Sequence, residues 1–179
     1  LSRQERETLA QTRKPAFRLM VPDREIVFQD GFQGEYRENL RRDCGDFIIR
    51  RSDGVFAYQL AVVADDGEMN ISQLVRGCDL LDSTPRQLYL YELLGYPAPE
   101  FYHIPLMMSG QTGKRLSKRD RDKDLGWLRK EFSRPEPILG QLGHMAGLLD
   151  RPEPVTAREL AQVFAKTPPE FLQKKELTQ

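Results

Sequence analysis

The spacing of hydrophobic and polar positions changes twice along the chain. Up to about residue 53, short apolar stretches alternate with charged residues, which predicts strands over 16–21, 25–29 and 47–51. We expect 16–21 to pair with 25–29 around the turn 22–24, and 47–51 to pair with 55–63 around 52–54. Ser2 and Glu5 form a capping-box pattern, which predicts a short helix to about residue 13. This opening third is therefore expected to be α+β and rich in hairpins.

From about residue 54 the apolar runs lengthen. Residues 56–63 and 71–75 are apolar enough to be predicted as strands buried on both faces, as parallel strands usually are. Thr84 and Pro85 are typical of a helix start, Gly95 of a helix end, and 102–108 is predicted as the next strand. The order strand, helix, strand predicts a right-handed βαβ unit. It would form half of a doubly wound nucleotide-binding domain.

The remainder has a helical pattern. It predicts helices over 125–132, 137–149 and 157–164, the last beginning with a Thr156 and Glu159 capping box. Prolines and charges after about residue 166 predict a frayed end. The expected fold class is thus α/β, with an α+β part over 1–53, a nucleotide-binding part over 54–110 and a loop with helices over 111–179.

Composition restricts the function classes only locally. Lys plus Arg and Asp plus Glu both number 27 in the 179 residues, so no overall charge indicates nucleic acid. Between Lys114 and Lys130, however, the chain has eight basic residues and only three acidic ones. This basic patch would attract phosphates. No apolar run is long enough to cross a bilayer, and no secretion leader is recognisable, which favours the cytoplasm.

The potential metal ligands are few and scattered. Cys44 and Cys78 are the only cysteines, and His103 and His144 the only histidines. They do not form the spaced quartet of a structural zinc site. We therefore expect free thiols and no metal site made by this chain alone.

The most informative stretch is the loop 109–119, which follows an apolar run and ends in clustered positive charge. Gly110 and Gly113 allow the backbone to bend, and the hydroxyl, ammonium and guanidinium groups can contact phosphate oxygens. Only two residues separate the glycines, which excludes a P-loop. On residue types alone, a polyphosphate-binding loop and a solvated basic turn both remain open.

Residues 115–119, Arg-Leu-Ser-Lys-Arg, resemble the Lys-Met-Ser-Lys-Ser signature of class I aminoacyl-tRNA synthetases. Upstream, four ordered blocks resemble the glutamyl-tRNA synthetase family over about residues 14–165: 46–54, 57–63, 75–87 and 103–106. The resemblance implies the second half of a class I Rossmann-like domain. A remnant of the acceptor-binding insertion would precede it, and a small helical domain like the stem-contact domain would follow.

The resemblance also implies site residues for glutamate. The residues that match Tyr58 and Arg76 hold the substrate glutamate in that family. From the sequence itself, Tyr58 would be a core tyrosine on the strand 56–63 and Arg76 a surface ion pair at a strand end. A fixed arginine would select an acidic side chain, because neutral analogues leave it unpaired.

The nucleotide side of the site is implied in the same way. Lys118 matches the signature lysine at the ATP phosphates, where a cation stabilises the charge that grows during adenylate formation. Ser117 and Arg115 would hold the loop or the phosphates. His103 lies in a region that, in members of the family, passes near the adenine of ATP. The alternative is a histidine at a strand end with no role in binding.

The implied reaction uses ATP, with Mg²⁺, to activate L-glutamate and transfer it to tRNA. The family's early His-Ile-Gly-His signature has no match here, so we expect a fragment that is inactive alone, or else a degenerate relative. Relatives carry their zinc ligands in that unmatched part.

Two further alternatives stay open. Gln59 and the sequence of residues 80–87 resemble the short paralogue that attaches glutamate to the queuosine base of an aspartate tRNA. A truncated ordinary glutamyl-tRNA synthetase would, however, end in the same way. A non-catalytic RNA- or partner-binding module is the competing function.

Overall fold

The computed structural model describes residues 2–12, 14–108, 125–166, 173 and 176–178. The chain divides into two compact units, one of Leu1–Arg76 with Leu80–Tyr102 and one of Gly77–Asp79 with His103–Gln179. The class is mixed α/β, as predicted. The three-part domain division remains a prediction.

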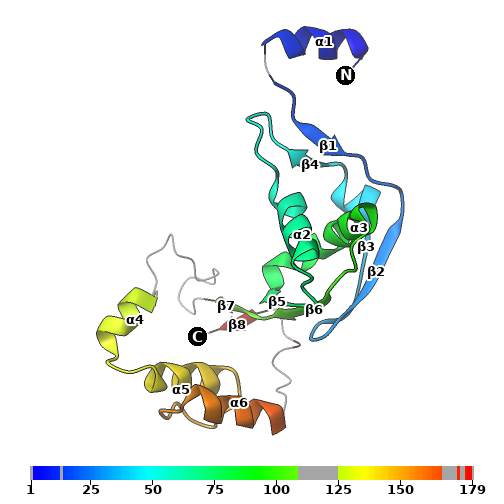
Figure 1. Ribbon diagram of the computed structural model, residues 1–179. Helices are drawn as coiled ribbons and strands as arrows, with labels where there is room; N and C mark the ends of the chain where they lie inside the picture. Colours follow the sequence, from blue (N-terminus) through cyan, green and yellow to red (C-terminus); the bar gives the residue numbers. More distant parts are fainter. Residues whose placement is uncertain (1, 13, 109–124, 167–172, 174–175, 179) are drawn as a thin grey trace. The chain divides into compact units, whose positions relative to one another are not determined.

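The elements are shown in Figure 1. In chain order they are α1 (Arg3–Thr12), β1 (Phe17–Leu19), β2 (Glu25–Asp30), β3 (Gly34–Asn39), the π-helical turn η1 (Leu40–Cys44), β4 (Phe47–Arg50), α2 (Tyr58–Glu68), β5 (Gln73–Gly77), the 3-10 helix η2 (Cys78–Ser83), α3 (Thr84–Leu94), β6 (Glu100–Ile104), β7 (Leu106–Met108), α4 (Leu125–Glu131), α5 (Glu136–Met145), α6 (Ala157–Lys166) and β8 (Glu176–Thr178).

The first strands lie close to their predicted positions, but the predicted pairing of 16–21 with 25–29 is wrong. β1 pairs with β4, and β2 pairs with β3, both antiparallel. β3 escaped prediction because its residues are mostly charged or polar and its exposed positions alternate with partly buried ones. It is held to β2 by the ring pair Phe28 and Tyr36, with centroids 5.6 Å apart, and by the Arg37–Glu25 ion pair at 3.4 Å.

The predicted strand over 56–63 is also wrong, because Tyr58–Glu68 forms helix α2. The expected hairpin around 52–54 is present only up to Ala57: Phe56 bridges Arg50, Arg51 N–H donates to the Val55 carbonyl at 2.8 Å, and Ala57 N–H donates to the Ile49 carbonyl at 2.9 Å. The buried residues of α2 are Val63 and Gly67, four positions apart, which is the spacing of one helix face. The helical period thus runs on through Asp65 and Asp66.

The core of the first unit lies where α2 and α3 pack side by side (Figure 1). Seven buried residues form it: Val21, Leu40, Phe47, Val63, Leu90, Tyr91 and Phe101. Gly67 permits the close approach of the Tyr96 ring, which would clash with any side chain there. α3 ends at Gly95 as predicted, with φ of 73°, a left-handed conformation that favours glycine.

The predicted order of strand, helix and strand is confirmed by β5, α3 and β6, since β5 and β6 are neighbours in one sheet. β5 is not buried on both faces, however, because Val75 is 65% exposed. The single strand expected over 102–108 is divided into β6 and β7 at Pro105, which has no N–H for a sheet.

The second unit contains the three predicted helices α4, α5 and α6. The Thr156 capping box is present: Thr156 N–H and hydroxyl both donate to Glu159, at 2.8 and 2.7 Å. The expected frayed end is wrong for Glu176–Thr178, whose backbone pairs in parallel with β7. Among the described residues, no helix has the length and apolar character needed to cross a bilayer.

A matched pair of substitutions in α3 tests this packing. Leu90 is 3% exposed and Leu93 is 51% exposed. Leu90→Ala should lower the free energy of unfolding by about 2–5 kcal/mol, because it removes buried contacts and leaves a cavity. Leu93→Ala should change it by less than about 0.5 kcal/mol. Urea unfolding followed by circular dichroism measures both, and similar losses for the two variants would contradict this packing.

Candidate functional site

Arg76 occupies the last-but-one position of β5, and its side chain is partly buried. Its Nη2 donates a hydrogen bond of 2.9 Å to Oγ1 of Thr84. Its Cζ lies over the Phe101 ring, 5.1 Å from the centroid. Burial lowers the pKa of Arg76, but a guanidinium stays charged at neutral pH. The arginine predicted from the sequence is therefore a fixed, half-buried cation rather than a solvated surface ion pair.

Tyr58 is the first residue of α2, not part of a strand, and it is 54% exposed. The core location that the sequence alone suggested is therefore wrong. Its phenol acts on Arg76 and opposes the fall in the pKa of that guanidinium. Tyr58 and Arg76, the two residues expected to hold glutamate, thus both belong to the first unit.

A chain of polar side chains fixes the start of α2 against α3. The Gln59 amide donates to Oγ of Ser83 at 3.1 Å, and the Gln87 amide donates to Oε1 of Gln59 at 2.7 Å. Ser83 and Gln87 are 8% and 1% exposed. Hydrogen bonds between buried groups are directional, so this chain sets the position of the α2 start, and with it Tyr58.

Tyr91 and Asp66 form a second contact between these helices. The Tyr91 hydroxyl donates to Oδ2 of Asp66 at 3.5 Å. Burial, and then the charge of Asp66, raise the pKa of Tyr91 to about 12, although Arg76 acts in the opposite direction. The phenol is therefore neutral at physiological pH.

His103 lies on β6 and belongs to the second unit. It is fully buried, and its backbone carbonyl accepts a 3.6 Å hydrogen bond from the Cys78 thiol. Cys44 and Cys78 are both free thiols, as predicted. The expected role of His103 near adenine stays a prediction.

The phosphate side of the predicted site, Arg115, Ser117 and Lys118, lies outside the described residues. Among the residues that are described, no group of three or more His, Cys, Asp or Glu is arranged to hold a metal ion.

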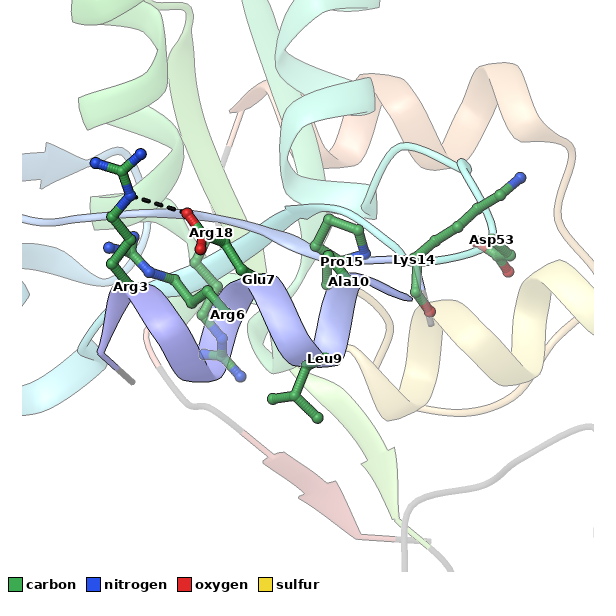
Figure 2. A pocket seen from close by; sticks show the side chains of 11 residues that line it. Arg3, Arg6, Glu7, Leu9, Ala10, Lys14, Pro15, Arg18 and Asp53 are labelled. Carbon is green, nitrogen blue, oxygen red and sulfur yellow. Dashed lines mark hydrogen bonds and ion pairs between the residues drawn. The ribbon is translucent and has the colours of Figure 1, made fainter. Parts of the chain in front are cut away.

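A cavity of about 1020 Å³ lies elsewhere in the first unit, between α1 and the segment that follows it (Figure 2). Arg3, Arg6, Lys14 and Arg18 supply positive charge around it, and Arg3 is paired with Glu7 at 2.9 Å. Neither Tyr58 nor Arg76 lines this cavity. It is therefore a basic surface feature of the part predicted to be an acceptor-binding insertion.

Comparison with known proteins identifies the family. The family of class I tRNA synthetases (E and Q), catalytic domain, matches residues 1–170. The chain belongs to this family.

Curated relatives of this synthetase family are similar over most of the chain. A glutamyl-Q tRNA(Asp) synthetase of Symbiobacterium thermophilum is 46% identical over 155 residues, which cover 87% of this chain and 47% of the relative. A glutamyl-Q tRNA(Asp) synthetase of Neisseria meningitidis serogroup C is 46% identical over 150 residues, which cover 84% of this chain and 49% of the relative. The chain thus spans about half the length of the curated relatives it matches.

Solved structures agree with this assignment. A glutamate tRNA ligase from Elizabethkingia meningosepticum, crystallised in complex with its amino acid, has a TM-score of 0.73 and 26% identity. The match covers 99% of this chain and 39% of the ligase. The resemblance to the glutamyl-tRNA synthetase family is therefore confirmed.

Sequence reasoning missed the residues that support Arg76. The sequence favours a helix start at Thr84, in a segment that the family resemblance places at the pocket, but it indicates no bond from Thr84 to Arg76 and no role for Phe101. Thr84 follows Arg76 by eight positions in a different element, and no helix or strand spacing rule connects the two. The apolar character of Phe101 indicated burial but not a contact with a cation.

The Tyr91 phenol provides a test by pH. Because its pKa is raised to about 12 in the folded protein, the folded state holds this proton while the unfolded state releases it near pH 10. Stability should therefore fall as the pH rises from 10 to 12. Tyr91→Phe should remove the step near pH 12 from an ultraviolet tyrosine titration, and Asp66→Asn should move that step to lower pH. A step that persists unchanged in Tyr91→Phe would disprove the assignment.

Proposed function

We propose that this protein activates L-glutamate with ATP and transfers the glutamyl group to a queuosine-containing aspartate tRNA. The observation that carries the proposal is the fixed Arg76 cation, in the same unit as Tyr58, in a chain whose similar relatives are glutamyl-Q tRNA(Asp) synthetases. A half-buried guanidinium suits a carboxylate ligand, because it forms two parallel hydrogen bonds with it and compensates its charge. The glutamate side chain supplies that carboxylate.

In the first step, an oxygen of the glutamate α-carboxylate would attack the α-phosphorus of ATP. The bond from that phosphorus to the bridging oxygen breaks, and pyrophosphate leaves with the negative charge. Lys118, with Ser117 and Arg115, would face this growing charge from the signature loop. Mg²⁺ would arrive with the phosphates of the nucleotide, and His103 would lie near adenine.

In the second step, a hydroxyl of the acceptor RNA would attack the glutamyl carbonyl; the bond from that carbon to the phosphate oxygen breaks, AMP leaves, and the hydroxyl proton is released to water. The basic residues around the cavity near α1, Arg3, Arg6, Lys14 and Arg18, support contact between this part of the chain and an RNA backbone. We assign 1–53 to the acceptor-binding insertion, 54–110 to the second half of the nucleotide-binding domain and 111–179 to the loop and a stem-contact-like domain.

Substitution of the loop lysine tests the first step. In the full product of the gene, Lys118→Ala should reduce glutamate-dependent pyrophosphate exchange by roughly 10²-fold, because a preorganised charge is lost from the transition state. Lys166→Ala removes an equal charge from an exposed position of α6 and should leave the exchange unchanged. Equal exchange in the parent and Lys118→Ala would remove Lys118 from the mechanism.

Acceptor choice tests the second step. Charging with labelled glutamate should occur on aspartate tRNA that carries queuosine, and not on the same tRNA without it. Charging of unmodified glutamate tRNA would instead identify an ordinary glutamyl-tRNA synthetase. RNA binding without pyrophosphate exchange would support the non-catalytic module and refute the enzyme.

A further inference from the structure

The first turn of α3 contacts the cation of the proposed glutamate site. Thr84, the first residue of α3, is fully buried. Its Oγ1 accepts the hydrogen bond from Arg76 and donates its own proton to the Leu80 carbonyl at 3.2 Å. A hydroxyl has a single proton, so donation to Leu80 directs an oxygen lone pair at the guanidinium.

Phe101, on β6, provides the second contact. Its ring is 3% exposed, and the Arg76 Cζ lies 5.1 Å from its centroid. A cation above an aromatic face is attracted by the electron density of the ring. The hydrogen bond restrains the direction in which the guanidinium points, while the ring restrains how far it can move from its packing position.

Two carboxylates compensate the buried charge at longer range. Asp66 and Asp30 both act to raise the pKa of Arg76, against the effect of burial. The Asp66 carboxylate also accepts from Tyr91, and the Asp30 carboxylate accepts from the backbone N–H groups of Phe32 and Gln33 at 3.0 and 2.9 Å. These contacts keep the carboxylates themselves in place.

We propose that Thr84 is a positioning residue for glutamate recognition: its hydroxyl, together with the Phe101 ring, holds the Arg76 guanidinium in the orientation that receives the substrate carboxylate. The inference rests on the proposed function, since it takes glutamate as the ligand of Arg76. An arginine that is ordered before binding loses less freedom when the ligand arrives, and affinity rises accordingly.

A conservative pair of variants separates the hydroxyl from the shape of the side chain. Thr84→Val keeps the branched shape and removes the oxygen, whereas Thr84→Ser keeps the oxygen. Thr8→Val is the matched control, because the Thr8 hydroxyl donates to the Gln4 carbonyl, four residues earlier, in exposed helix α1. Thr8→Val therefore loses the same kind of hydrogen bond, from a threonine hydroxyl to the carbonyl four residues earlier, at a position far from Arg76 in the sequence.

Two readouts on the full gene product test the proposal. Nitrogen-15 spectra of the arginine side chains, with Arg76 assigned by its loss in Arg76→Lys, report how fast the guanidinium rotates. Calorimetry gives the dissociation constant of L-glutamate. Thr84→Val should accelerate the rotation and weaken glutamate roughly tenfold. Thr84→Ser and Thr8→Val should match the parent in both measurements.

Unchanged rotation and affinity in Thr84→Val would overturn the inference, as would a faster rotation with unchanged glutamate affinity. If Thr84→Val fails to fold, Phe101→Leu replaces the ring by an apolar side chain and should loosen Arg76 in the same spectra; unaltered spectra would again overturn the inference. Failure of the parent to bind glutamate would refute the proposed function, while the Arg76 spectra still decide whether Thr84 holds the guanidinium.

Discussion

The burial of one cation constrains the first unit more than any other feature. The Arg76 side chain is partly buried at the end of β5. A charge in that position is stable only if neighbouring groups replace the hydration that it loses. Thr84 supplies an oxygen, Phe101 an aromatic face and Asp66 a compensating charge. These three groups come from α3, β6 and α2, so the elements that build the fold also build the site.

The interface between α2 and α3 also fixes the position of Tyr58, the first residue of α2. Apolar contacts such as those of Val63 and Leu90 hold the helices together but do not define their register sharply. The hydrogen bonds from Gln87 to Gln59 and from Gln59 to Ser83 define this register, because each requires a particular geometry. The start of α3 supplies Thr84 to Arg76, and these hydrogen bonds tie the start of α2, which carries Tyr58, to the start of α3.

The sequence predicts those features that depend on local chemistry. Both capping boxes, the end of α3 at Gly95 and the three late helices follow from residues within one turn of each other. The run 56–63 favours a strand because Gln59 is its only clearly polar side chain, and the helical period of α2 becomes visible only when Gly67 is included. The family resemblance implies a shared role for Tyr58 and Arg76, whereas the support of Arg76 by Thr84 and Phe101 depends on tertiary contacts that no local pattern contains.

The most direct test of the account is the preference of the protein for glutamate over glutamine, measured by calorimetry on the parent and on Arg76→Ala. Glutamine has the same size but no charge, so it would leave the fixed guanidinium without a counter-charge. The account predicts that the parent binds glutamate more tightly than glutamine by roughly 10²-fold or more, and that Arg76→Ala loses most of this preference. A preference that Arg76→Ala leaves unchanged would contradict it.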